Sequence, residues 1–226
     1  MDSASFPDFR RALALLNANW SMILPGLVIG ALSGLLEGLF TPPDTATPAG
    51  SAIGLILILI TDVVAAILAI AYTTGMAQAA WTRGHATFGD GAQAFRREGG
   101  HVFIAMLVLL VLGLAAAFLA PFTVGLSLAV YAFFCIYTMP AAVVGERKGF
   151  EAVSESAEIA YHRPLQTGIL IVAIAIIGAL MGYVAELLGF APLIGPIVKA
   201  LVVQAVIAYV TLVVVGEYVT LRGRPA

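Results

Sequence analysis

The chain of 226 residues is 61% hydrophobic and 11% charged, its formal net charge is −2, and its mean hydropathy is +1.03. Because soluble domains average about 45–50% apolar and about 25% charged residues, this composition excludes a soluble globular domain. It predicts an integral membrane protein whose solvent is the lipid bilayer.

Six apolar runs follow one another along the chain. A helix of about 20 residues, with a rise of about 1.5 Å per residue, crosses a hydrocarbon layer of about 30 Å. The sequence therefore predicts an all-α, polytopic protein with six transmembrane helices, forming a single membrane domain over residues 1–226. The runs are approximately Trp20–Leu39, Ser51–Ala79, Val102–Phe122, Val124–Val144, Leu165–Phe190 and Pro196–Val219.

The basic residues predict how these spans are oriented. Of the eleven Lys and Arg residues, only Lys199 would lie on one side of the bilayer, and an excess of basic residues marks the cytoplasmic side. We therefore expect a multi-pass protein of the plasma membrane or bacterial cell inner membrane, with both termini cytoplasmic and no nucleic-acid partner. The basic residues on the other side are Arg10, Arg11, Arg83, Arg96, Arg97, Arg147, Lys148, Arg163, Arg222 and Arg224.

A segment with helical periodicity precedes each odd-numbered span. Each segment begins with a phenylalanine, Phe6, Phe88 or Phe150, about 14 residues before the membrane entry. The third segment is the best amphipathic helix, and we expect it to lie along the membrane surface. Its apolar face would consist of Phe150, Val153, Ala157 and Ala160.

The same pattern predicts an internal repeat. The outer ends of the first and fifth spans read GALSG at 30–34 and GALMG at 178–182. Three units, 1–81, 82–147 and 148–226, would each consist of a surface helix followed by a transmembrane hairpin. Because each unit contains two spans, the three copies would share one orientation in the membrane.

The stretch from Pro140 to Ser156, together with this pattern, resembles a known membrane domain. It is similar to the six-span domain attached to some bacterial glycerophosphodiester phosphodiesterases and to uncharacterised stand-alone relatives of that domain. The resemblance implies a membrane fold and carries no catalytic residues with it. The matching positions are Pro140, Glu146, Gly149, Glu151, Ala152, Val153 and Ser156.

Glycines recur every fourth residue along one face of the first span, in the pattern of a glycine zipper. Such a face lets another helix approach closely in lipid. It would serve either a homo-oligomer contact or packing inside the monomer against the fifth span. We favour packing inside the monomer, because Ser33 and Glu37 flank the face. The glycines are Gly26, Gly30, Gly34 and Gly38 in the first span, and Gly178 and Gly182 in the fifth.

Asp62 is the candidate intramembrane polar site. It lies roughly 13 Å along the axis of the second span, which is close to the midplane of the bilayer. A carboxyl group there must face the interior, take a hydrogen-bond partner or bind a proton. Gln204, at a similar depth in the sixth span, is the expected partner. Asp62 is then either a proton or cation site or a protonated structural residue, and we favour the structural role.

Three further charged residues lie near the predicted outer ends of the spans. They are Glu37, Glu186 and Lys199. Glu186 and Lys199 have a similar depth and are expected to pair across the hairpin of the fifth and sixth spans. The alternative is that each of the three meets interfacial water.

No catalytic, metal or cofactor motif stands out. Cys135 is the only cysteine, and none of the three histidines has the spacing that places two ligands on one helix face. We therefore favour a non-enzymatic scaffold, accessory subunit or assembly factor, which would show a dry interior and exposed surface helices. A small transporter or channel using Asp62 is the alternative, and would need a polar path to both surfaces. An intramembrane enzyme, with ionisable groups clustered at the cytoplasmic mouth, comes third.

Overall fold

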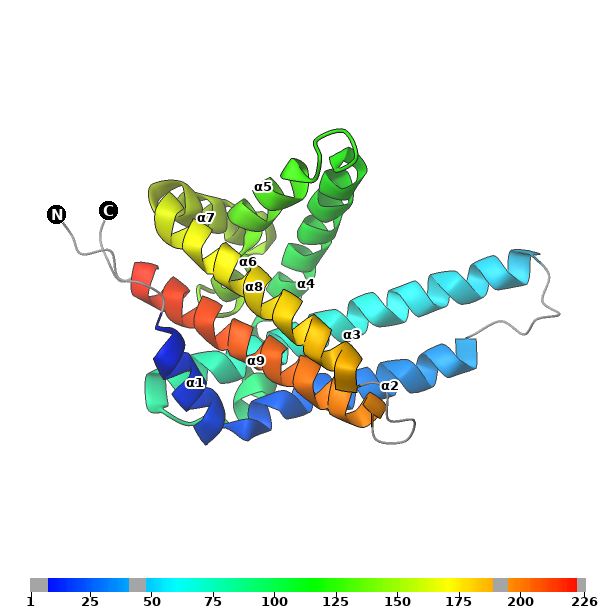
Figure 1. Ribbon diagram of the computed structural model, residues 1–226, viewed down its shortest axis with the longest axis horizontal. Helices are drawn as coiled ribbons and strands as arrows, with labels where there is room; N and C mark the ends of the chain where they lie inside the picture. Colours follow the sequence, from blue (N-terminus) through cyan, green and yellow to red (C-terminus); the bar gives the residue numbers. More distant parts are fainter. Residues whose placement is uncertain (1–7, 41–47, 189–194, 223–226) are drawn as a thin grey trace.

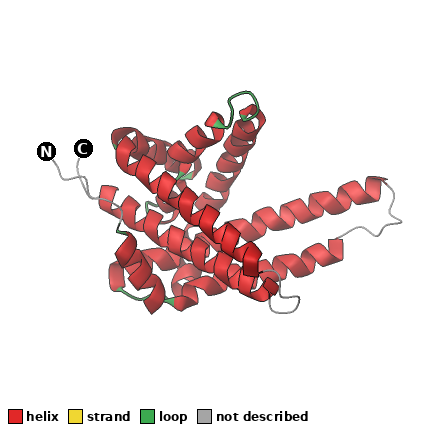
Figure 2. Ribbon diagram, in the orientation of Figure 1, coloured by secondary structure: helices red, strands yellow, loops and turns green. Residues whose placement is uncertain are grey.

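The computed structural model describes residues 8–40, 48–188 and 195–222, and these form helices joined by short connections, without a strand (Figure 2). The first elements are α1 (Phe9–Ala18), the 3₁₀ helix η1 (Trp20–Ile23), α2 (Leu24–Phe40), α3 (Pro48–Arg83) and α4 (Phe88–Leu119). They are followed by α5 (Leu126–Cys135), α6 (Thr138–Val143), α7 (Gly149–His162), α8 (Pro164–Leu188) and α9 (Gly195–Arg222). The all-α prediction is confirmed for the described residues.

Four stretches of the described chain are long and apolar enough to cross a membrane: Phe88–Leu119, Leu126–Val143, Pro164–Val184 and Val198–Arg222. A fifth is added if Phe9–Ala18 and Trp20–Leu32, which meet at a bend of 93°, count as one span. The structure thus supports a membrane protein with four or five candidate spans among the described residues.

Three pairs of helices consecutive in the chain, α2 with α3, α4 with α5 and α8 with α9, pack against each other. In Figure 1 the α2–α3 pair and the α4–α5 pair point in clearly different directions from a common base. The base contains α1, α6, α7, the N-terminal half of α4 and the C-terminal halves of α3 and α9, and we call it the core end.

The buried side chains gather at the core end. Tyr137 of α5–α6, Met76 of α3 and Leu212 of α9 are among the largest fully buried residues. Far from the core end, large apolar side chains are exposed instead: Phe118 is 74% and Leu180 61% exposed. Exposed apolar side chains suit contact with lipid, because lipid tails are as apolar as they are.

The surface helix α7 buries a different face from the one that periodicity predicted. Ala160 is buried as expected, but Phe150 is 75% exposed and its place is taken by Gly149, Ala152 and Ser156. The reason is that α7 packs against α4, α5 and α6, and small side chains allow helices to approach closely. The bulky apolar residues therefore flank the contact instead of forming it.

The predicted surface segment at Phe88 is continuous with the span that follows it, so α4 runs without a break over Phe88–Leu119. Its start is held by Asp90, whose carboxylate accepts a hydrogen bond from the Thr87 N–H at 2.8 Å and pairs with Arg83 at 2.5 Å.

The first and third surface helices end in the same way. Asn19 after α1 has φ −131° and ψ 53°, and Arg163 after α7 has φ −130° and ψ 55°. Each residue turns the chain from a surface helix into the helix that follows.

Asn19 also ties this bend to the connection between α3 and α4. Its amide nitrogen donates to the carbonyl oxygens of Leu15 at 2.8 Å and Gly84 at 3.3 Å, and its Oδ1 accepts from the Ala86 N–H at 2.6 Å. The amide side chain is suited to this position because it both donates and accepts.

We predict that Asn19→Ala lowers the unfolding free energy by about 1–3 kcal/mol, because the buried Ala86 N–H loses its acceptor. Asn17→Ala is the matched control, since Asn17 is exposed on α1. The measurement is thermal unfolding of the purified protein in detergent. Equal losses for the two variants would contradict the assigned role of Asn19.

Candidate functional site

Arginines connect the helices of the core end to one another. The Arg11 guanidinium lies 4.5 Å from the centre of the Trp81 ring, and Arg97 pairs with Glu146 at 3.0 Å. Further along, Arg147 and Arg222 both reach Glu155. We call Arg11, Arg83, Arg97, Arg147 and Arg222 the arginine belt. These five residues all lie at the core end. The sequence predicts that they lie on one side of the bilayer.

Glu155 contacts three side chains at this end. Its Oε1 accepts a hydrogen bond from the Tyr218 hydroxyl at 2.6 Å and lies 3.6 Å from Arg222 Nε. Its Oε2 accepts from Arg147 Nε at 2.5 Å. The hydrogen bond to Glu155 raises the pKa of Arg147. Through these contacts Glu155 joins α7 to the end of α9.

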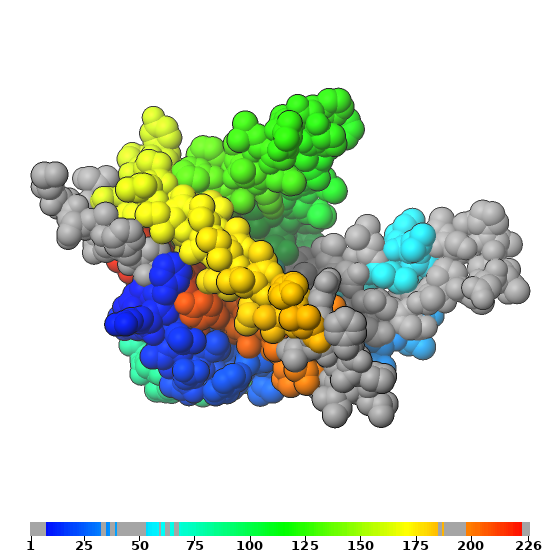
Figure 3. Space-filling model, viewed as in Figure 1, coloured from blue at the N-terminus to red at the C-terminus, as the bar shows by residue number. Residues whose placement is uncertain are grey.

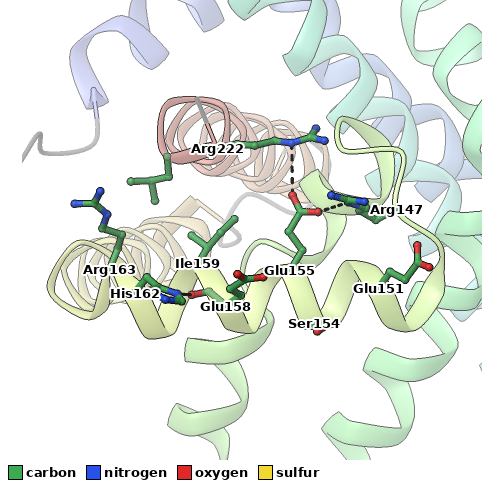
Figure 4. Close-up of a pocket in the computed structure, with 10 residues that line it drawn as sticks. Arg147, Glu151, Ser154, Glu155, Glu158, Ile159, His162, Arg163 and Arg222 are labelled. Carbon is green, nitrogen blue, oxygen red and sulfur yellow. Dashed lines mark hydrogen bonds and ion pairs between the residues drawn. The ribbon is translucent and has the colours of Figure 1, made fainter. Parts of the chain in front are cut away.

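A cavity of about 420 Å³ opens beside Glu155, between α7 and the C-terminal end of α9 (Figure 4). Three arginines and three glutamates line it, so the formal charges of the lining balance. Figure 4 shows Arg147 and Arg222 on one side of Glu155, with Glu158 and His162 further along α7. The lining residues are Arg147, Glu151, Ser154, Glu155, Glu158, Ile159, His162, Arg163, Leu221 and Arg222.

A second acid, Glu98 of α4, is buried at the core end. Arg97 Nε and His101 Nδ1 each lie 2.8 Å from one of its carboxylate oxygens. A buried carboxylate is tolerated when it is paired and hydrogen-bonded in this way. Sequence reasoning missed this cluster, although the spacing of Glu98 and His101, three residues apart on a helix, is a signal for it.

The fourth predicted span is divided into α5 and α6. Pro140 has no N–H to donate to the carbonyl of Ile136, four residues earlier, and its ring disfavours a continuous helix. Ser156 of α7 bonds two other backbone groups at this break: its hydroxyl donates to the Phe134 carbonyl at 2.7 Å and accepts from the Tyr137 N–H at 3.0 Å. Pro140 and Ser156, the two ends of the stretch that resembles a known membrane domain, thus act on the same helix break.

Trp81 joins α3 to α9 at the core end. Its indole N–H donates to the Leu212 carbonyl at 2.7 Å. A methyl group at Gly216 would collide with the indole ring, so glycine is needed there for the close approach. The Trp81 ring is therefore a packing element of the fold as well as an aromatic group near the predicted membrane boundary.

The predicted partner of Asp62 has a different described neighbour. Gln204 lies against α2, where a methyl group at Gly26 would collide with the Gln204 amide. The side chains of Asp62, Glu37 and Glu186 lie outside the described residues, so their proposed pairings stay predictions. Lys199 is exposed.

The glycine faces do not meet inside the monomer where their surroundings are described. A methyl group at Gly30, Gly178 or Gly182 meets no described atom within 4 Å, so these glycines lack the close contact that we predicted. The reason lies in the arrangement of the helices: α2 packs against α3 and touches α9, and α8 packs against α9. The surroundings of Gly34 and Gly38 lie outside the described residues.

Two further kinds of site concern the described part of the chain: metal-ion sites and a second hollow. No group of three or more His, Cys, Asp or Glu side chains there is placed to hold a metal ion. An open hollow between α4, α5, α8 and α9, about 440 Å³ in volume, is lined mainly by apolar residues such as Leu109, Ile171 and Val210.

Comparisons with protein-family models, curated proteins and solved structures found no match for this chain. The resemblance to the membrane domain of bacterial phosphodiesterases therefore rests on its residues alone and stays a prediction. The site has to be interpreted from its own geometry.

We predict that Ser156→Ala destabilises the protein by about 1–3 kcal/mol, because the Tyr137 N–H and the Phe134 carbonyl both lose their partner at the helix break. Ser154→Ala, two residues away on the exposed side of α7, should have little effect. Thermal unfolding in detergent measures both changes. If Ser156→Ala unfolds at the wild-type temperature, the hydroxyl does not support the break.

Proposed function

We propose that this protein is a six-span integral membrane protein that acts as a non-enzymatic scaffold, accessory subunit or assembly factor for other membrane components. The observation that carries this proposal is the uneven distribution of packing. The helices are held together at the core end, whereas the outer halves of α4, α5 and α8 present large apolar surfaces (Figure 3). Such surfaces suit contacts with lipid and with other transmembrane helices.

Six spans are consistent with the described helices. Four of the six would be the four apolar stretches. The first span would be η1 with α2, the second arm of the bent pair, and the second would be α3, which has 36 residues and lies beside α2 and α4. In this arrangement α1, the start of α4 and α7 would lie at one membrane surface, which the arginine belt marks as cytoplasmic. The membrane would be the plasma membrane or the bacterial inner membrane.

The threefold repeat belongs to the same proposal. The matching bends at Asn19 and Arg163 support equivalence of the first and third units, 1–81 and 148–226. The second unit, 82–147, differs because its surface segment continues directly into the span. The open surfaces at Gly30, Gly178 and Gly182 leave a glycine contact with a second copy as a further proposal.

The enzyme alternative requires a cluster of ionisable groups at the cytoplasmic end of the protein, and the charged cluster at Glu155 is the candidate for it. Its geometry favours a structural or binding role, because the Tyr218 hydroxyl and Arg147 each donate to one carboxylate oxygen and Arg222 lies 3.6 Å away. These contacts use the carboxylate to hold α7 against the end of α9. We therefore keep the non-enzymatic proposal in first place.

The topology predicts different accessibility for two single cysteines placed on a Cys135→Ser background. Gln93→Cys, at an exposed position near the core end, should be protected from a membrane-impermeant thiol reagent in intact cells. Thr45→Cys, in the predicted outer connection, should be labelled. The Cys135→Ser protein without an added cysteine is the control. Labelling of Gln93→Cys from outside would reverse the proposed orientation.

The scaffold proposal predicts that the protein, solubilised from its native membrane in mild detergent, purifies in a complex with another membrane protein. Phe118 and Phe122 form an exposed aromatic pair at the outer end of α4, with ring centres 6.3 Å apart. Their joint replacement by alanine should weaken the complex by about tenfold, as expected for aromatic anchors of an interface, without lowering the unfolding temperature.

Phe103→Ala is the control for this prediction, because Phe103 is an exposed phenylalanine of the same helix near the core end. Reconstitution of the protein in liposomes tests the transporter alternative. Solute or proton flux that disappears with Asp62→Asn, while the protein remains folded, would place the transporter alternative first.

A further inference from the structure

We infer that the cavity beside Glu155 binds the headgroup of a zwitterionic phospholipid that carries a primary amine, with an acyl chain lying along α8. This inference rests on the proposed membrane arrangement and adds a ligand class to it. The first argument is location. The cavity lies at the arginine belt, at the corner where the surface helix α7 turns into the span α8. In the proposed arrangement this corner is at the depth of the lipid headgroups.

The second argument is the charge of the lining. Three arginines and three glutamates face one cavity, so a ligand with a single charge would meet like and opposite charges in equal number. A phosphoethanolamine group carries both signs, a phosphate and a nearby ammonium. Arg222 and Arg163 are suited to the phosphate, because a guanidinium presents several donors to phosphate oxygens.

The ammonium has two candidate acceptors. Glu155 is already occupied by Tyr218, Arg147 and Arg222, which leaves Glu151 and Glu158 of α7. These residues are seven apart, about two helical turns, and so project from the same side of the helix. A primary ammonium donates hydrogen bonds to a carboxylate, whereas a quaternary ammonium has no N–H to donate.

The third argument is the surface next to the cavity. Directly after Arg163, a shallow, open apolar groove of about 470 Å³ follows one side of α8 from Pro164 to Ile176. A methyl group at Gly168 would meet nothing within 4 Å, so the groove is open at this position. Figure 3 shows part of α8 on the molecular surface. A polar cavity that ends at Arg163 and an apolar groove that begins at Pro164 match a molecule with a charged head and a hydrocarbon chain.

Native mass spectrometry of the purified protein in detergent tests this inference. Phosphatidylethanolamine, phosphatidylcholine and phosphatidylglycerol with identical acyl chains are titrated separately. We expect phosphatidylethanolamine to bind in a 1:1 complex about tenfold more tightly than the other two, as one charge-assisted hydrogen bond would provide. Equal binding of the three lipids would overturn the headgroup assignment.

Two pairs of variants locate the site. Glu158→Gln should weaken binding of phosphatidylethanolamine about fivefold to tenfold, whereas Glu146→Gln, outside the cavity, should leave it unchanged. Gly168→Leu fills the groove and should weaken binding of all three lipids, with Gly100→Leu as its control, since a methyl group at Gly100 also meets nothing within 4 Å. Unchanged unfolding temperatures show that the variants are folded. If neither Glu158→Gln nor Gly168→Leu affects binding, the inference is wrong. Because the assay does not depend on orientation or on a protein partner, that result would leave the proposed function standing.

Discussion

In a bilayer, apolar helices gain little by associating, because the surrounding lipid is as apolar as they are. The contacts that hold this protein together therefore have to come from hydrogen bonds, ion pairs and the close approach of small residues. These contacts are concentrated at the core end, where Trp81 reaches α9 and Glu155 binds Tyr218. Away from that end, the α2–α3 and α4–α5 pairs diverge.

Breaks in the helices are stabilised by side chains from other segments. Asn19 bonds backbone groups of the connection between α3 and α4, and Ser156 bonds those exposed by the division between α5 and α6. In an apolar environment an unsatisfied backbone group costs several kcal/mol, so irregular backbone is tolerated only where such partners exist. Both side chains belong to a surface helix or to the residue that ends it. The helices α1 and α7 thus help to connect the helix pairs to each other.

The charged residues at the core end have two roles that follow from their geometry. Arg97 with Glu98, and Arg147 with Glu155, use their charges within the fold. Glu158 and Arg163 line the cavity between α7 and α9, where a ligand would meet them. A balanced lining of this kind favours zwitterions over simple ions. For a scaffold, binding a particular lipid would adjust how the α8–α9 pair is seated in the membrane and which surface it offers to partners.

The sequence by itself determined the class of protein and the approximate position of its helices. In lipid, a long apolar run forms a helix, since every backbone group must be hydrogen-bonded within the segment. Most of the helices that contain these runs begin within a few residues of the predicted starts. The gathering of arginines at one end also agrees with the sequence, because the segments that carry them are separated by two predicted spans each, which return the chain to the same end.

Only the tertiary structure decided which faces meet. Periodicity assigned Phe150 to the buried face of α7, whereas contact with α4, α5 and α6 selected Ala152 and Ser156. Glycine spacing predicted contact between the first and fifth spans, but α2 and α8 pack against other neighbours. The approach of Tyr218 to Glu155 joins residues 63 positions apart. Periodicity reports which residues share a face of one helix, whereas the choice of partner depends on how the shapes and polar groups of several helices fit together, and no single segment contains that information.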